Sequence, residues 1–187
     1  METEKQKMLN GKWFHSRDPE LIKDKNKIIT FLKVFNQNEN PYKVEEKLRD
    51  VLGGIGTNVK VGRDFDVTYG YNLFIGDDVS INRGCKFLDT GKIKIGNLCF
   101  IGPNVHFYAT SHPIDPKVRR NPETHDLVLP GEIVIGENVW IGGNVTIISG
   151  VHIGDNSVIG AGSVVTKDIP SNTVAVGNPA RVIKKLQ

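Results

Sequence analysis

Residues 135–165 read IGENVW IGGNVT IISGVH IGDNSV IGAGSV V, and an isoleucine or valine returns at every sixth position from Ile135 to Val165. A period of six fits neither an amphipathic helix, which repeats near 3.6, nor an alternating strand, which repeats at two. It is typical of three short, flat faces that are wound into a coil and stacked as a parallel β-helix. We therefore expect the apolar residue of each hexad to point inward and to stack on its counterpart one coil away.

The six-residue spacing extends back to Ile55. Three earlier runs begin at Ile55, Ile75 and Ile95, and each is offset by two residues from the one before, so some coils are longer than others. A glycine follows many inward residues, and we expect it to permit backbone angles that a Cβ would obstruct at a corner. The fifth place of each hexad is small or β-branched. Cys85 and Cys99 stand there, which predicts that both are packed wall residues.

Composition divides the chain near residue 53. All but one of its 20 glycines lie at or after Gly53, in a chain of 187 residues. No apolar run approaches the ~20 residues that span a bilayer, and the polar N-terminus is unlike a signal peptide, so we expect a cytoplasmic protein without a membrane partner. The formal net charge of +3 is too small to indicate nucleic-acid binding. Two cysteines cannot form a disulfide framework.

Residues 1–54 are expected to form an N-terminal helical cap, and residues 55–187 a β-helix domain with a short C-terminal tail. Asp18-Pro19-Glu20 is a helix-start signal, and a further helix is expected from Pro41 to Val51. Residues 113–130 interrupt the repeat with a polar stretch that holds four prolines. A loop of this length in a compact repeat is usually functional. The hexad count has it leave the coil just after His112, and has the repeat end at Ser171.

These features resemble the hexapeptide-repeat acyltransferases, and among them the maltose and galactoside O-acetyltransferases. The motifs that carry the resemblance follow one another along nearly the whole chain: Trp13-Phe14, Asp18-Pro19-Glu20-Leu21, Tyr69-Gly70-Tyr71-Asn72, Thr110-Ser111-His112-Pro113, Trp140-Ile141-Gly142, Val165-Thr166-Lys167 and Gly177-Asn178-Pro179-Ala180-Arg181. The resemblance implies a mainly β fold, a left-handed parallel β-helix, and acetyl-CoA as the donor with no metal required. It also implies a homotrimer with active sites between subunits.

The resemblance assigns the role of catalytic base to His112, which matches the family's catalytic His-Pro. Histidine suits this role because its pKa lies near neutrality. Because His112 closes a hexad, we expect its side chain to project outward. For the hydroxyl acceptor, the resemblance implies contacts from Asn82, Asp89, Thr68 and Ser16.

The cap departs from the family pattern at the acceptor. Ser16 stands where the family has an acceptor-binding Asp, and Lys25 stands where it has an Arg. Ser80 replaces the usual aromatic residue two positions before Asn82. Whether the acceptor is a sugar therefore stays open.

On the donor side, the resemblance implies that acetyl-CoA lies along the C-terminal coils. Gly143 matches the position whose backbone contacts the thioester, so its N–H is expected to hold the oxyanion. Further donor contacts are implied for Trp140, Ala161, Thr166, Lys167, Arg181 and Lys184, with the tail cations meeting the CoA phosphates.

Three other functions are weighed against this one. An acetyltransferase of the same fold could act on a drug, an amino acid or a polysaccharide precursor. A γ-type carbonic anhydrase would bind zinc through three histidines, but the spacing of His106 and His112 does not match its ligands. A non-catalytic β-helix scaffold would need neither His112-Pro113 nor Trp140 nor a basic tail.

Overall fold

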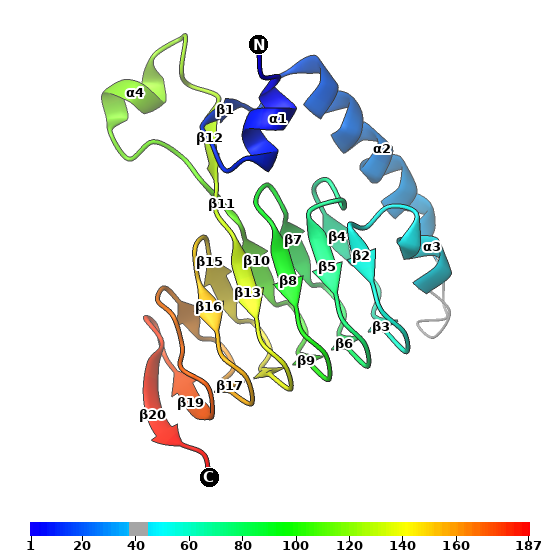
Figure 1. Ribbon diagram of the computed structural model, residues 1–187, viewed down its shortest axis with the longest axis vertical. Coiled ribbons are helices and arrows are strands. Elements are labelled where there is room, and N and C mark those ends of the chain that lie inside the picture. Colours follow the sequence, from blue (N-terminus) through cyan, green and yellow to red (C-terminus); the bar gives the residue numbers. More distant parts are fainter. Residues whose placement is uncertain (38–44) are drawn as a thin grey trace.

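The computed structural model describes residues 1–37 and 45–187. Its body is a three-sided prism of short parallel strands, with helices at the N-terminal end and a loop that stands out to one side (Figure 1). No helix of the described ranges is long and apolar enough to cross a bilayer.

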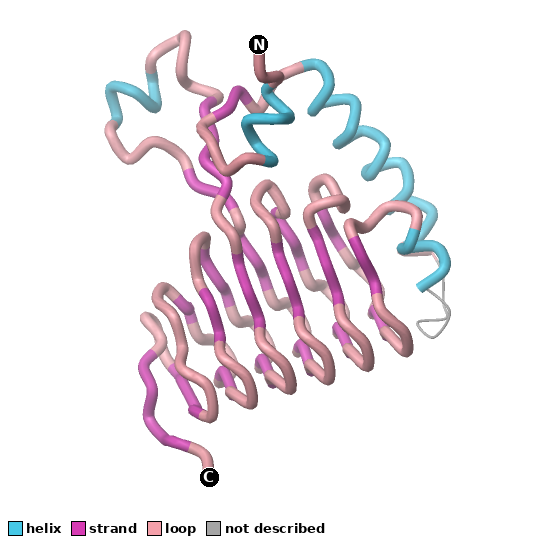
Figure 2. The backbone as a smooth tube through the Cα atoms, viewed as in Figure 1, coloured by secondary structure: helices cyan, strands magenta, loops and turns pink. Residues whose placement is uncertain are grey.

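Each side of the prism is one sheet, in which neighbouring parallel strands come from successive coils (Figure 2). Face 1 consists of β2 (Gly54–Ile55), β5 (Leu73–Ile75), β8 (Ile93–Ile95), β13 (Ile133–Ile135) and β16 (His152–Ile153). Face 2 consists of β3 (Lys60–Val61), β6 (Ser80–Ile81), β9 (Phe100–Ile101), β14 (Trp140–Ile141), β17 (Val158–Ile159), β19 (Thr173–Val176) and the antiparallel β20 (Arg181–Lys185). Face 3 consists of β4 (Asp66–Val67), β7 (Lys86–Leu88), β10 (His106–Tyr108), β15 (Thr146–Ile148) and β18 (Val164–Val165).

Three edges join the faces. We call the turns from face 1 to face 2 the 1–2 corner, those from face 2 to face 3 the 2–3 corner, and those from face 3 to the next coil's face 1 the 3–1 corner. These names are used below to say which residues of one chain lie near one another.

The inward hexad residues form the core, as the period predicts. From Ile135 to Val165 every sixth residue is at most 2% exposed. An aromatic column joins the cap to the prism: ring centroids lie 5.9 Å apart for Phe35 and Phe65, 5.4 Å for Phe65 and Phe87, and 4.7 Å for Phe87 and Phe107. Burying each such ring contributes about 2–3 kcal/mol, so the column fixes the cap on the first coil.

The reason predicted for the hexad glycines, that they permit backbone angles which a Cβ would obstruct, is wrong. The glycines that follow inward residues do not have a positive φ; asparagine and aspartate supply it at the corners, for example Asn138 and Asn156. A Cβ on Gly102 would instead lie 2.6 Å from the backbone N of Gly143, and one on Gly142 would lie 2.6 Å from the N of Ala161. Glycine is therefore required because successive coils approach too closely for a side chain.

The cap contains α1 (Glu4–Leu9), α2 (Pro19–Phe35) and α3 (Glu45–Arg49). Asp18 caps α2 and Pro19 begins it, as expected. One segment of the cap is not helical: β1 (Phe14–His15) is a strand. The predicted start of the last cap helix, Pro41–Val44, lies outside the described residues.

The interruption carries more structure than a polar loop. It contains α4 (Pro116–Arg120) and β12 (Leu127–Pro130), and β12 lies between β1 and β11 (Thr110–Ser111) in a small antiparallel sheet. The chain therefore leaves the coil after β10, before His112 and earlier than the hexad count predicts. At the other end, β19 pairs with β17, so the repeat continues past Ser171.

Candidate active site

His112 lies at the root of the protruding loop, on the 3–1 corner. Its side chain is exposed, as expected, but the reason differs, because the chain has already left the coil before this residue. Its Nδ1 lies 3.2 Å from the carbonyl oxygen of Leu127. Because a carbonyl oxygen can only accept a hydrogen bond, Nδ1 carries the proton, and in the neutral ring the lone pair is on Nε2. The contact thus leaves Nε2 as the basic nitrogen.

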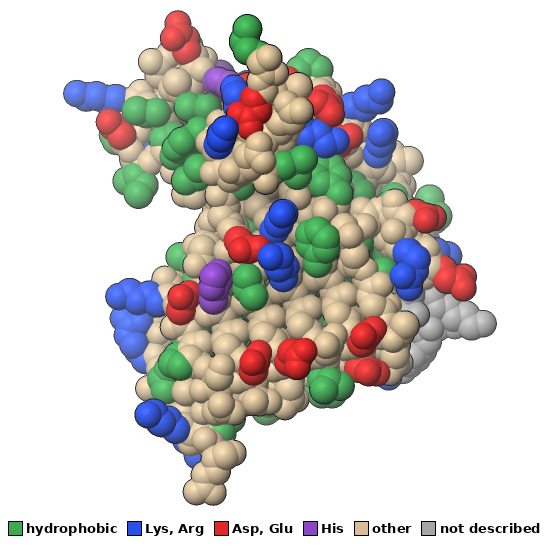
Figure 3. Space-filling model, in the orientation of Figure 1, with side chains coloured by type: hydrophobic (Ala, Val, Ile, Leu, Met, Phe, Trp, Pro, Cys, Tyr) green, Lys and Arg blue, Asp and Glu red, His purple; other side chains and the backbone are tan. Residues whose placement is uncertain are grey.

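The strand that holds His112 is itself held by the cap. Val128 of β12 is buried with Phe14 of β1, Met8 of α1 and Leu21 of α2. Ser16 donates its N–H to the carbonyl oxygen of Asp126 at 3.1 Å, so Ser16 and His112 contact adjacent residues of the same loop segment. Figure 3 shows the cap and loop as a lobe that stands off from the prism, with a hollow between the loop and the C-terminal coils.

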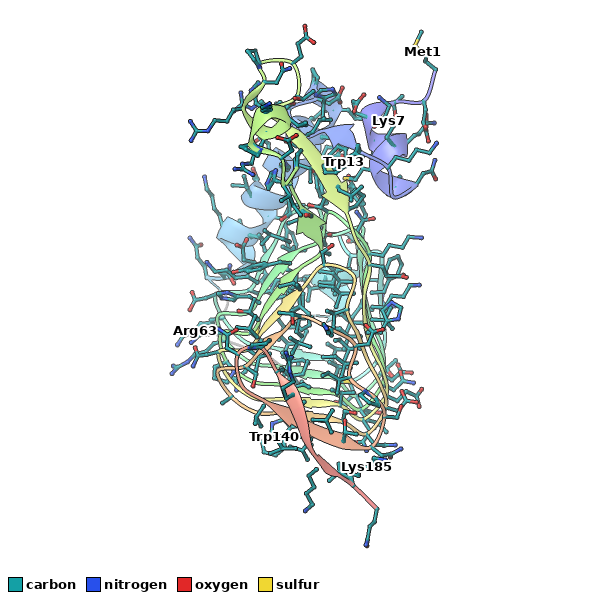
Figure 4. All side chains as sticks on the ribbon, turned by 90° about the vertical axis from the view of Figure 1, so that its left-hand side faces the viewer. Met1, Lys7, Trp13, Arg63, Trp140 and Lys185 are labelled. Atoms are coloured by element: carbon teal, nitrogen blue, oxygen red, sulfur yellow. The ribbon has the colours of Figure 1, made fainter. Side chains whose placement is uncertain are left out.

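A second set of site residues lies on face 2. A groove of about 480 Å³ is lined by Asn82 and Trp140 together with Lys60, Gly62, Ser80, Ile81, Phe100, Ile101 and Gly102. Trp140 projects outward from the prism, well away from Trp13 and the cap (Figure 4). The structure thus brings Asn82 and Trp140 together. It also adds Phe100, which occupies the same outward place in its hexad as Trp140 and could have been found by that register.

The backbone N–H groups of Gly143 and Ala161 lie at the 2–3 corner, just after the strands of face 2. Within residues 1–37 and 45–187, the N–H groups of Gly143 and Ala161 donate to no acceptor, although the carbonyl of Gly143 accepts from Gly162 at 2.9 Å. They stand on successive coils, and the glycine at position 142 keeps the coils close. Unpaired N–H groups are the donors that a developing oxyanion or an amide carbonyl requires.

The remaining predicted donor contacts are spread over two further regions. Thr166 and Lys167 follow β18 at the 3–1 corner, and Arg181 and Lys184 lie on β20 at the C-terminal end of face 2. Lys167, Arg181 and Lys184 are exposed. The residues predicted from the sequence are thus spread over the cap, face 2, the 2–3 corner and the 3–1 corner of one chain.

The predicted acceptor contact of Asp89 is corrected by its burial. Asp89 is 0% exposed, and its carboxylate accepts the N–H groups of Thr68 at 2.9 Å, Tyr69 at 2.8 Å and Asn72 at 3.3 Å. Burial raises its pKa to about 6, although the three N–H donors favour the charged form. Asp89 holds the 3–1 corner together and is not offered to an acceptor. Thr68 stands beside it with a half-buried side chain.

Neither cysteine takes part in the site. Cys85 and Cys99 are fully buried, as their place in the hexad predicts, and burial raises the pKa of each thiol to about 11. In the part of the chain that the structure describes, no three His, Cys, Asp or Glu side chains gather as a metal site would require.

Comparison with known proteins agrees with this architecture. Bacterial transferase hexapeptide repeats match residues 132–167, and a maltose acetyltransferase hexapeptide capping motif matches residues 7–56. A Saccharomyces cerevisiae protein named "Putative acetyltransferase" is 43% identical over 173 residues, which is 90% of this chain and 85% of that protein.

Two solved structures extend the likeness to three dimensions. A maltose O-acetyltransferase from Clostridium difficile 630 gives a TM-score of 0.93 at 45% identity, covering 99% of this chain and 98% of that one. A hexapeptide-repeat acetyltransferase from Vibrio cholerae, solved with acetyl-CoA, gives 0.89 at 34% identity, covering 99% of each chain. The prism is thus the left-handed parallel β-helix of these proteins, and the chain is an acetyltransferase that belongs to the maltose/galactoside O-acetyltransferase family of hexapeptide-repeat acyltransferases.

Proposed function

We propose that this protein transfers the acetyl group of acetyl-CoA to a hydroxyl of a sugar or glycoside, by direct attack in a ternary complex with His112 as the general base. The observation that carries the proposal is the hydrogen bond from His112 Nδ1 to the Leu127 carbonyl oxygen. It leaves the lone pair of the exposed ring on Nε2, where it can accept a proton from a hydroxyl.

The step balances without a covalent intermediate. Nε2 of His112 takes the proton of the acceptor hydroxyl as its oxygen bonds to the thioester carbonyl carbon. The oxyanion accepts a hydrogen bond from the N–H of Gly143. When the carbon–sulfur bond breaks, the sulfur receives the proton from His112 and leaves as the thiol of CoA. The burial of Cys85 and Cys99 supports direct transfer, because neither thiol reaches the surface.

The donor follows from the surroundings of Gly143. The free N–H of Ala161, one coil further on, is suited to an amide carbonyl of the pantetheine arm. The exposed cations Arg181 and Lys184 on β20 suit the phosphates of CoA. Acetyl-CoA is bound to the Vibrio cholerae relative, which supports the same donor here.

The proposed assembly is a homotrimer with active sites between subunits, and the division of the site between corners supports the sharing of each site by two subunits. In one chain, His112 and Ser16 lie with the loop at the 3–1 corner, whereas Asn82 and Gly143 belong to face 2 and the 2–3 corner. A neighbour's loop that reaches this corner unites the base with the face 2 groove and with the N–H of Gly143. The same contact covers Trp140, which one chain leaves 57% exposed.

The acceptor side rests on fewer groups. Asn82 lines the groove of face 2, and its amide can exchange hydrogen bonds with a sugar hydroxyl. The maltose O-acetyltransferase from Clostridium difficile supports a sugar. The burial of Asp89 removes one expected sugar contact, so non-sugar alcohols belong in the test.

The test is release of free thiol from acetyl-CoA across a panel of maltose, glucose, galactosides, non-sugar alcohols and amines, with each product identified by mass. We expect O-acetylated sugar from the wild type, and at least about 100-fold slower product formation by the His112→Ala variant. Product from amines alone overturns O-acetylation, and the absence of thiol release with every acceptor of the panel favours a scaffold. A protein mass increased by one acetyl group during turnover overturns direct transfer.

A further inference from the structure

One side-chain hydrogen bond joins the cap to the loop next to His112. Nδ1 of His15 lies 2.8 Å from Oδ1 of Asp126, and the two residues are 111 positions apart in the chain. The Asp126 side chain is only 11% exposed, and that of His15 is 42% exposed. The hydrogen bond from His15 lowers the pKa of Asp126, so this carboxyl is ionised at neutral pH.

Asp126 also accepts hydrogen bonds from the backbone of the cap, in addition to the His15 ring. Its Oδ2 accepts the N–H of Arg17 at 3.4 Å, and its carbonyl oxygen accepts the N–H of Ser16 at 3.1 Å. The backbone N–H of His15 in turn donates to Glu4 of α1 at 2.6 Å. The segment His15–Arg17 therefore grips a single loop residue through its ring and two backbone donors.

The next residue in the chain is Leu127, whose carbonyl accepts from His112. The N–H of Leu127 donates to Thr124 within the loop at 3.0 Å, and Val128 is buried against the cap. Displacement of Asp126 by a few tenths of an ångström would move the Leu127 carbonyl, because one peptide unit joins them. In the part of the chain that the structure describes, the His112 ring has no other hydrogen-bond partner that would hold Nδ1 in place.

We propose that His15 and Asp126 are positioning residues for His112: their hydrogen bond holds the loop strand so that the Leu127 carbonyl fixes the tautomer and direction of the His112 ring. This inference rests on the proposed role of His112 as the base. If the His112 ring points in the wrong direction, the rate of the chemical step falls, whereas the affinity for acetyl-CoA is unchanged.

A purely structural hydrogen bond predicts something different. Partly exposed pairs contribute little to protein stability, so breaking one would lower the melting temperature slightly and leave kcat unchanged at a temperature where the protein is folded. The readouts are therefore kcat and KM for acetyl-CoA, together with a direct observation of the His112 ring.

The variants are Asp126→Ala, which removes the acceptor, Asp126→Asn, which keeps a neutral acceptor, and His15→Phe, which keeps a ring without the donor. The control is Glu2→Gln, which breaks the pair of Glu2 with Lys12 at 2.9 Å inside the cap and does not touch the loop. For Asp126→Ala and His15→Phe we expect kcat to fall about 10- to 100-fold, as for other residues that orient a functional histidine. Asp126→Asn should keep most of the rate, and Glu2→Gln all of it.

The double variant that combines Asp126→Ala with His15→Phe should show no lower kcat than either single variant, because the two residues act as a unit. The tautomer of His112, read from its ring nitrogen resonances, tests the positioning even without turnover: the Nδ1–H form should decline in Asp126→Ala and not in Glu2→Gln. If wild-type protein transfers no acetyl group, the proposed function fails and the resonances still decide the positioning. Unchanged resonances in Asp126→Ala overturn this inference, as does an unchanged kcat in an active enzyme.

Discussion

Trp140 lies directly beside Phe100 on the outside of face 2, as register partners of β14 and β9, and the two rings are 57% and 60% exposed. Both line the groove that contains Asn82. Adjacent exposed aromatic rings at a polar groove mark a surface that a partner or ligand covers. Together with the separation of His112 from this groove in one chain, they lead to the first prediction.

Mixed oligomers should recover activity that neither parent has. His112→Ala removes the base, and Ala161→Trp places a bulky ring at an exposed corner of the donor path. If each site uses His112 of one subunit and the groove of the next, random one-to-one mixing restores about a quarter of the sites. Co-expression with two tags, tandem purification and a thiol-release assay measure the recovery. Activity that stays at the level of the two parents would place each site within one chain.

His112→Ala should lower kcat by about 10²- to 10⁴-fold, the usual contribution of a general base. KM for acetyl-CoA should change little, because the donor groups lie on other coils. His125→Ala is the matched control: this histidine is also in the loop, but its Nδ1 bonds to the carbonyl of Pro122 within the loop. Steady-state kinetics of the wild type, His112→Ala and His125→Ala measure this difference in kcat. Equal losses in both variants would indicate a general disturbance of the loop.

Replacing Arg181 or Lys184 by alanine should raise KM for acetyl-CoA about 5-fold each, the effect of removing one exposed ion pair worth ~1 kcal/mol. The value of kcat should be preserved, because these cations are remote from the thioester. Added salt should weaken donor binding in the wild type more than in the double variant. A short thioester without the nucleotide should show no dependence on either cation, and such a dependence would contradict the assignment.

Asp89 should make the protein less stable as the pH rises from about 4 to 6. Its pKa is about 6 in the folded protein and 3.8 as a free side chain. Between these values the folded state keeps a proton that the unfolded state has lost, so stability falls as the pH rises and is constant above 6. The difference reaches ~3 kcal/mol. Urea unfolding of the wild type and of Asp89→Asn at several pH values isolates this contribution. If the free energy of unfolding changes with pH in the same way in both proteins, the raised pKa of Asp89 is refuted.

Leu98→Asn should stabilise the protein by about 1 kcal/mol. Leu98 has a φ of +60° at the 1–2 corner, where asparagine or aspartate takes the same conformation in the other coils described, and its side chain is half exposed. Leucine in this region costs roughly 1–2 kcal/mol, whereas asparagine tolerates it. Leu98→Ala is the control, because it removes apolar surface but keeps the strain. Thermal unfolding should rank asparagine above both leucine and alanine.

The repeat was predictable because its signal is local and redundant. The same six-residue spacing recurs at every inward residue from Ile135 to Val165, so a deviation at one position would not hide the period. The reason for the glycines was not predictable, since the contact of Gly102 with the backbone of Gly143 exists only after coils stack. The strand Phe14–His15 was missed for the same reason: its partner, Leu127–Pro130, is more than a hundred residues away.

The candidate site divides in the same way. His112, Asn82 and Gly143 could be named from motifs, since residue type and order survive without coordinates. Motifs could not reveal that Asp89 is buried under three N–H groups, because burial depends on how two coils meet.

The amino-acid sequence by itself determined the parallel β-helix, the inward residues and the presence of an interruption in the repeat, because each follows from spacing along the chain. Only the tertiary structure decided what surrounds each functional group. It brought His15 to Asp126, and with it set the Leu127 carbonyl against His112. It also put this histidine and Asn82 on different corners of one chain. Such relationships join residues that are distant in sequence, and no local pattern of residues encodes them.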